Sequence, residues 1–224
     1  MTFEYREYIN TDGIEMATTR ISRSERKAQT RTELIAAARS VFMGRGFHGA
    51  SLDDIAEAAG YTKGAVYSNF AGKDDLYLAL LDAHYEGRVT AYASMLLDHT
   101  TFEEATRAVG RFMVDADARD PDWLPTLAEF VAHAARDETL RLAYVRIRER
   151  FLVAIADVIE TLCEKHGLAL LVPPLEAARA SSLLVRGYSA ERRLDPDAVS
   201  PEMFVELHAG FMRGLTVPNE RSQT

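Results

Sequence analysis

The chain has a single cysteine, Cys163, among its 224 residues. One thiol excludes an intramolecular disulfide framework and suits a reducing compartment, so we expect a cytoplasmic protein. No apolar run approaches the roughly 18 to 20 residues needed to span a bilayer; the longest patch, Leu168 to Val172, is far too short. The start of the chain also lacks a signal-peptide pattern. We therefore expect no membrane partner.

Motifs of the common enzyme classes are missing as well. The sequence contains no His-Glu-x-x-His, no Gly-x-Ser-x-Gly and no glycine-rich phosphate loop. Its six histidines stand far apart, without metal-ligand spacing. The acidic stretch from Asp115 to Asp122 lacks the glycine and the glutamate that a calcium loop requires. We expect no enzymatic activity, no metal site and no cofactor.

An overall excess of positive charge is also absent, because the formal net charge is −8. That value alone argues against a nucleic-acid partner. The distribution softens the argument, since residues 20–75 hold nine Lys/Arg against seven Asp/Glu, whereas residues 76–224 hold 16 against 23. A slightly basic segment on an acidic remainder can approach phosphates from one side only.

The region between Ser51 and Phe70 has the pattern of two short helices separated by a tight turn. Ser51 is a good N-cap, and apolar residues follow at i, i+3, i+4 and i+7 from Leu52. Gly60 can adopt the left-handed conformation that ends a helix, and Thr62 can cap the next one. This spacing predicts a helix-turn-helix unit.

The second of these helices has an unusual outer face. Val66 and Phe70, at i and i+4, can hold the helix to a core. The remaining positions are small or polar, of the types that contact phosphates and base edges in a major groove: Lys63, Gly64, Ala65, Tyr67, Ser68 and Asn69. From spacing alone, a DNA-reading face and a merely solvated face remain equally open.

A longer compound pattern surrounds this unit. It consists of Gly-Arg-Gly-Phe at 44–47, Leu-Asp-Asp-Ile-Ala-Glu-Ala-Ala-Gly at 52–60, Gly-Ala-Val-Tyr-Ser-Asn-Phe at 64–70 and Lys-Asp-Asp-Leu at 73–76. In order and spacing, Arg26 to Leu81 resembles the N-terminal domain of the TetR family of transcriptional regulators. The resemblance implies a dimeric regulator, most often a repressor, that binds a pseudo-palindromic double-stranded DNA operator and is released by a small-molecule effector.

Carried onto these positions, the resemblance and the residue chemistry together predict the DNA contacts. Phosphate contacts are expected from Ser51, Tyr67 and Lys73, and base-edge contacts from Lys63, Ala65, Ser68 and Asn69. Thr62 and Gly64 complete the predicted DNA-binding set. Lys73 opens the next helix, whose free N–H groups favour a phosphate.

The whole chain reads as all-α. We expect a flexible arm over residues 1–22, a three-helix DNA-binding domain over 23–72 and a helical ligand-binding and dimerisation bundle over 73–220. Predicted helices cover 24–45, 73–97, 102–118, 122–135, 139–165, 174–192 and 201–215. No segment shows the alternation of a strand. The sequence leaves open whether Met1 or Met16 is the true start.

Two further sets of residues are expected in the bundle. A pocket for a partly hydrophobic effector is predicted from large side chains and possible polar anchors: Phe112, Met113, Trp123, Phe130, His133, Phe151 and Arg186. Small and apolar side chains on the last two helices predict a homodimer interface: Ala177, Ala180, Ser181, Leu184, Phe204, Leu207 and Phe211. In both sets, ordinary core packing is the competing interpretation.

Two other functions compete with an effector-controlled regulator. One is a DNA-binding protein that is gated by another protein docking on the bundle. The other is a helical enzyme or scaffold whose helix-turn-helix binds nothing. Neither the effector, the operator, the regulated genes nor the sign of regulation can be deduced from the sequence.

Overall fold

The computed structural model describes residues 22–95 and 99–219. Apart from Ser22, the arm expected over residues 1–22 lies outside the described residues, as does the choice between Met1 and Met16. The described chain contains nine helices and two short strands, in this order: α1 (Arg23–Gly49), α2 (Leu52–Ala58), α3 (Lys63–Asn69), α4 (Lys73–Met95), α5 (Phe102–Arg119), α6 (Trp123–Ala134), α7 (Glu138–Lys165), β1 (Leu168–Leu170), α8 (Pro174–Leu194), α9 (Pro201–Gly214) and β2 (Thr216–Pro218).

The helix-turn-helix prediction is confirmed in its local details. The Ser51 side chain accepts a hydrogen bond from the Asp54 N–H, and the Asp54 carboxylate accepts one from the Ser51 N–H, which is a complete capping box. Thr62 caps α3 by accepting from the Ala65 N–H at 3.3 Å. Gly60 lies between the two helices at φ +69°, where a glycine avoids the Cβ strain of other residues.

Regular helical geometry in α1 stops at Gly46, as its sequence position predicts. Gly46 has φ +70° and ψ 171°, a combination that is essentially restricted to glycine. The chain bends there and makes one more short turn to Gly49. The bend turns Phe47 into the core, where its side chain is almost completely buried.

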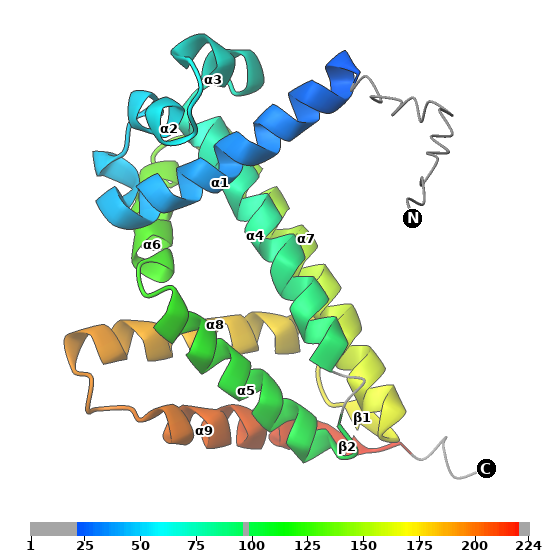
Figure 1. Ribbon diagram of the computed structural model, residues 1–224. Helices are drawn as coiled ribbons and strands as arrows, with labels where there is room; N and C mark the ends of the chain where they lie inside the picture. Colours follow the sequence, from blue (N-terminus) through cyan, green and yellow to red (C-terminus); the bar gives the residue numbers. More distant parts are fainter. Residues whose placement is uncertain (1–21, 96–98, 220–224) are drawn as a thin grey trace, which may run out of the picture.

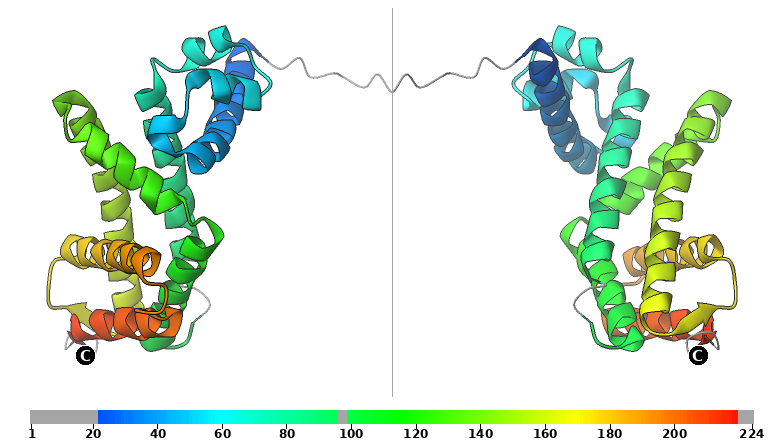
Figure 2. Two further views of the ribbon diagram at one scale, coloured as in Figure 1. Left: turned by 90° about the vertical axis from the view of Figure 1, so that its left-hand side faces the viewer. Right: turned by 90° about the vertical axis from the view of Figure 1, so that its right-hand side faces the viewer.

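The helices form a head (α1–α3) at one end of the molecule and a body (α4–α9) that extends from it (Figure 1). Helices α4 and α7 run side by side away from the head, and α8 and α9 lie at the far end of the body. Both views in Figure 2 show the same separation between the head and the α8–α9 end. The helical fold with an N-terminal helix-turn-helix therefore matches the predicted all-α class.

The hydrophobic core does not stop at the expected boundary between residues 72 and 73. One continuous cluster includes Leu34 and Phe42 of the head, Tyr77 of α4, Phe130 of α6 and Tyr144 of α7. Helix α6 packs directly on α1. Head and body are therefore joined by shared apolar packing.

The prediction that the chain has no strand is wrong. Strands β1 and β2 pair antiparallel, with Ala169 opposite Val217. Gly167, at φ +64°, turns the chain from the end of α7 into β1. Three-residue strands are too short to show alternation in a sequence, and their pairing depends on a partner almost 50 residues away. This pairing holds the segment that follows α9 against the segment that follows α7.

Within the described residues, every helix is too short or too polar to cross a membrane.

Candidate nucleic-acid interface and body cavity

Helix α3 is held to the head by one side only. Val66 and Phe70 are buried in the head core, as their i, i+4 spacing predicts. The opposite side, which carries Lys63, Gly64 and Ser68, is exposed, and the Tyr67 side chain is 53% exposed. A two-turn helix therefore presents a polar, small-residue surface at the outer end of the head (Figures 1 and 2).

Two arginines of α1 hold the helix-turn-helix to α1, Arg31 through the end of α3 and Arg45 through α2. The Arg31 guanidinium lies 4.3 Å from the centroid of the Phe70 ring and donates to the Asn69 carbonyl at 3.0 Å. That bond satisfies a carbonyl at the end of α3, which has no partner within the helix. Arg45 pairs with Asp54 at 2.6 Å and links α1 to α2. Arg31 thus supports the end of α3.

The expected base-contacting side chains differ in their availability. Lys63 pairs with Asp53 at 2.8 Å, and this hydrogen bond and charge raise the pKa of the lysine ammonium. Both side chains are largely exposed, so the pair can exchange for a phosphate or a base at small cost. Ala65 is half-buried, and the Ser68 hydroxyl donates back to the Ala65 carbonyl at 2.8 Å.

Asn69 is less available than its sequence position suggests. Its amide nitrogen donates to the Ala65 carbonyl at 2.8 Å, so the side chain folds back along its own helix. Its amide oxygen is buried and has no hydrogen-bond partner among the described residues. A base contact by Asn69 therefore requires its side chain to rotate away from α3.

Among the expected phosphate contacts, Tyr67 is the most accessible. The Ser51 hydroxyl is exposed but donates to Asp54 at 2.6 Å. The Lys73 ammonium is half-buried and donates to the Phe47 and Ala50 carbonyls at 2.9 and 3.2 Å. It also lies 4.6 Å from the centroid of the Phe47 ring. Lys73 therefore joins α4 to the end of α1 and retains one N–H for a phosphate.

Replacing Lys73 with methionine should have two separable effects. Loss of charge-assisted bonds to two carbonyls should lower the free energy of unfolding by about 1–3 kcal/mol. Loss of one phosphate contact per protomer should reduce the salt dependence of DNA binding by about one unit of slope per contact. Urea unfolding measures the first effect and binding isotherms at several salt concentrations measure the second. An unchanged slope in a destabilised variant would leave Lys73 with the structural role alone.

Two side chains predicted to line an effector pocket instead form the junction between head and body. Phe130 is fully buried, with its ring 5.2 Å from that of Phe47 and 4.4 Å from that of Tyr77. The His133 imidazole approaches the Asp74 carboxylate at 3.2 Å and lies beside the ring of His48. Neither side chain lines the body cavity described below, because α6 turns these positions toward α1 and α4.

Glu129 on the same helix makes a backbone contact with the head. Its carboxylate accepts from the His48 N–H at 3.2 Å. A Cβ placed on Gly46 would lie only 2.7 Å from one oxygen of Glu129. The bare backbone at Gly46 thus makes room for this carboxylate, which ties α6 to the bend in α1.

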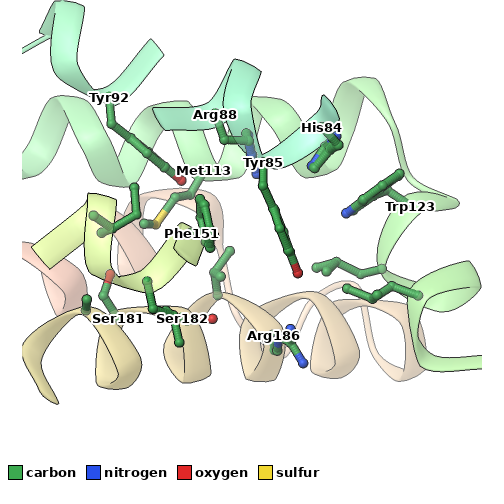
Figure 3. Close-up of a pocket in the computed structure, with 16 residues that line it drawn as sticks. His84, Tyr85, Arg88, Tyr92, Met113, Trp123, Phe151, Ser181, Ser182 and Arg186 are labelled. Atoms are coloured by element: carbon green, nitrogen blue, oxygen red, sulfur yellow. The ribbon is translucent and has the colours of Figure 1, made fainter. Parts of the chain in front are cut away.

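The body contains a cavity between α4, α5, α6, α7 and α8 (Figure 3). It encloses about 620 Å³ of empty space, part of it open to solvent. Four predicted residues line it: Met113, Trp123, Phe151 and Arg186. Phe112 does not, because its ring packs edge-on against Tyr92, 5.3 Å between centroids, and under Arg88.

Sequence reasoning missed three α4 side chains, Tyr85, Arg88 and Tyr92, which project into this cavity from positions spaced by three or four residues. His84, on the same helix, also lines the cavity. The signal was present, because α4 is apolar on more than one side, as a helix packed between several neighbours must be. Burial and the nearby guanidinium groups of Arg88 and Arg39 lower the pKa of His84 to about 3. His84 is therefore neutral at physiological pH.

The residues expected at a dimer interface fall into two groups. Ala177, Ser181 and Phe204 are buried inside the protomer, so their side chains cannot meet a second subunit while this packing persists. Ala180, Leu184 and Phe211 are half-buried, and Leu207 is exposed. The exposed apolar side chains on the same helices, which the prediction omitted, are Leu183, Leu194 and Met203.

Comparison with known proteins agrees with this architecture. Residues 34–80 match the family model described as bacterial regulatory proteins, tetR family. The chain is 38% identical over 89 residues to the HTH-type transcriptional activator FasR of Mycolicibacterium smegmatis, an alignment that covers 40% of this chain and 39% of that protein. It is 45% identical over 67 residues to the HTH-type transcriptional regulator TtgR of Pseudomonas putida, covering 30% of this chain and 32% of the relative.

The matches to these curated relatives thus span only about a third to two fifths of their length. The fold similarity extends further. A TetR transcription regulator from Haloarcula marismortui superposes with a TM-score of 0.67 at 17% identity, covering 85% of this chain and all of that one. The family match covers α2, α3 and the adjoining parts of α1 and α4. The fold match also includes the helical body. Residues 34–80 therefore match the tetR family of bacterial regulatory proteins, and the described chain shares the fold of a solved TetR regulator.

Proposed function

We propose that the chain is a homodimeric transcriptional repressor that reads a pseudo-palindromic DNA operator with α3. A small molecule bound in the body cavity releases the repressor from the operator. One observation carries the proposal: the outer face of α3 is polar, exposed and free of bulky aliphatic side chains, on a helix that Val66 and Phe70 anchor in the head core. Such a face fits a major groove, where small residues permit close approach.

The proposed DNA contacts follow from exposure. Lys63, Gly64, Tyr67 and Ser68 form the central surface, with Thr62 and Ser51 at its edge. Ala65, Asn69 and Lys73 complete the set after small side-chain movements. Two heads about 34–36 Å apart would meet adjacent major grooves on one face of the DNA.

The proposed control runs through α6. Trp123, Leu124 and Leu127 line the cavity, and Glu129 and Phe130, on the next turns, contact the head. An effector that favours a different position of α6 also favours a different position of the head. The resulting change in DNA affinity is limited by the difference between the effector's affinities for the two positions. The names of similar proteins carry both signs of regulation, since FasR is called an activator and NicS of Pseudomonas putida a repressor.

Selection of bound fragments from the host genome, followed by footprinting, tests this function. We expect enrichment of a site with two related halves about one helical turn apart, bound by two protomers. The protein is also unfolded, dialysed and refolded before a second selection, to remove any ligand already bound. Failure of both preparations to enrich DNA at low salt would contradict the proposal.

The dimer is proposed to form through the exposed apolar side chains of α8 and α9. Leu183→Glu should raise the dimer dissociation constant at least about tenfold, because the new charge would have to be buried in the interface. Leu142→Glu is the matched control, since Leu142 is an exposed leucine on α7. Analytical ultracentrifugation measures both variants. Equal dissociation constants for the two variants would remove Leu183 from the interface.

A further inference from the structure

The body cavity continues into a second, more apolar space. The second cavity comprises about 430 Å³ of space, part of it open to solvent, between α4, α5, α7, α8 and α9. Four residues line both spaces: Tyr92, Met113, Ile155 and Ser181. The two cavities therefore adjoin at the end of the first cavity where Tyr92, Met113 and Ser181 lie (Figure 3). Along α7, the residues that line one or the other cavity run from Phe151 to Leu162. This is a helical length of about 16 Å.

The far end of this combined cavity is lined by side chains that need no hydrogen bond from a ligand. Its wall is largely aliphatic, with Val158, Leu162 and Met212 among the lining residues. The His208 ring nitrogens are 3.0 Å from the Ser181 hydroxyl and 3.2 Å from the Thr106 carbonyl, so this buried histidine is already satisfied. Burial lowers the pKa of His208, which favours its neutral form. A hydrocarbon chain fits such a wall without leaving polar groups unpaired.

The near end is positively charged. Its lining includes Arg88 and Arg186 and contains no aspartate or glutamate. The Arg186 guanidinium donates to the Tyr144 hydroxyl at 3.2 Å, a neutral partner. In the described part of the chain, neither arginine takes part in an ion pair. A partly desolvated guanidinium without a carboxylate is a site that an anion would stabilise.

Arg186 is a better anion site than Arg88. Arg88 also borders a neighbouring hollow that contains Asp117 and Asp120. Those two carboxylates are engaged, because Asp117 accepts from Ser189 at 2.6 Å and Asp120 pairs with Arg39. No carboxylate borders the first cavity beside Arg186. Arg186 lies at the same end as His84 and Trp123, away from the junction with the second cavity (Figure 3).

We propose that the effector is an amphipathic organic anion, with a carboxylate or phosphate head on Arg186 and one apolar chain that passes Met113 and Ile155 into the second cavity. This inference rests on the proposed function, which assigns the cavity to the effector. It excludes cationic amphiphiles, because two guanidinium groups and no carboxylate line the near end.

Ligand binding can be followed by the fluorescence of Trp123, because Trp123 is the only tryptophan in the chain and lines the first cavity. Its ring stacks on His84 with 3.7 Å between centroids, so a ligand head placed there should change its fluorescence. The probes share one chain length and differ in the head group: decanoate, decyl phosphate, decanol and decylamine, all below their micelle concentrations. We expect one of the two anions to bind at least about tenfold more tightly than decanol, and decylamine to bind most weakly.

Arg186→Gln tests the head site, and Val158→Phe tests the chain site. In Arg186→Gln the anion should lose its advantage while the affinity for decanol stays within about twofold, a change of selectivity that general misfolding would not produce. In Val158→Phe, decanoate should bind at least about tenfold more weakly while hexanoate is unaffected. Val153→Phe is the matched control, because Val153 is an exposed valine on the same helix.

Equal binding of the four ten-carbon probes by the natural protein, preferred binding of decylamine, or no binding of any of them would overturn the proposal. The same protein is tested for binding to its selected DNA fragment. Normal DNA binding with no anion preference contradicts the effector class alone. Arg186-dependent anion binding by a protein that binds no DNA supports the ligand site and contradicts the regulatory function.

Discussion

Replacing Phe130 with alanine is expected to lower the free energy of unfolding by about 3–5 kcal/mol. The Phe130 side chain is fully buried where α6 meets the head, in contact with the rings of Phe47, Tyr77 and Tyr144. Its removal would leave a cavity lined by rings that cannot easily close it. Urea unfolding followed by circular dichroism measures the change.

Leu142→Ala is the control for this variant, because Leu142 is a large apolar residue that is 41% exposed. It should change the free energy of unfolding by no more than about 0.5 kcal/mol. A comparable, small loss in both variants would show that Phe130 does not carry the packing between head and body.

Gly46→Ala is expected to cost about 2–4 kcal/mol, which combines backbone strain with a lost hydrogen bond. At φ +70° and ψ 171° an alanine is strained. Its Cβ would also lie 2.7 Å from a Glu129 oxygen, so the carboxylate must move and release the His48 N–H. The substitution should therefore weaken both α1 and its attachment to α6.

Gly44→Ala is the matched control two residues earlier in the same helix. Gly44 has no atom within 4 Å of an added Cβ and does not have positive φ. Alanine there should be neutral or stabilising by up to about 1 kcal/mol. Thermal unfolding of the two variants separates them. A Gly46→Ala protein as stable as Gly44→Ala would contradict the role assigned to the bend.

Local signals predicted the head well. Ser51, Gly60 and Thr62 act through hydrogen bonds and backbone angles within a few residues, so their roles are readable in the sequence. The exposed and buried sides of α3 follow from helical periodicity for the same reason. A helix of seven residues with two anchors, Val66 and Phe70, leaves little freedom in how it can pack.

Contacts between distant segments were not predictable in this way. The pattern of α6 cannot show that Phe130 and His133 face the head while Trp123 faces the cavity, because all three lie on apolar or mixed stretches. Lys73 was predicted to contact a phosphate, yet its ammonium also donates to the Phe47 and Ala50 carbonyls at the end of α1. Phe204 and Ala177 read as interface residues, but the packing of α5, α7 and α9 buries them within the protomer.

We propose that the exposed face of α3 binds DNA, and Gly64→Glu tests this proposal most directly. Gly64 is exposed in the first turn of α3, where a glutamate suits the positive helix end and leaves the fold intact. Gly87→Glu is the matched control, because Gly87 is an exposed glycine in α4 with open space around it.

Binding isotherms on the selected genomic fragment compare the two variants with the natural protein. We predict that Gly64→Glu weakens binding on the order of 100-fold, through repulsion from phosphates and lost close approach, with unchanged thermal stability. Gly87→Glu should bind within about twofold of the natural protein. Equal affinity of the Gly64→Glu and Gly87→Glu proteins for the fragment would contradict the account.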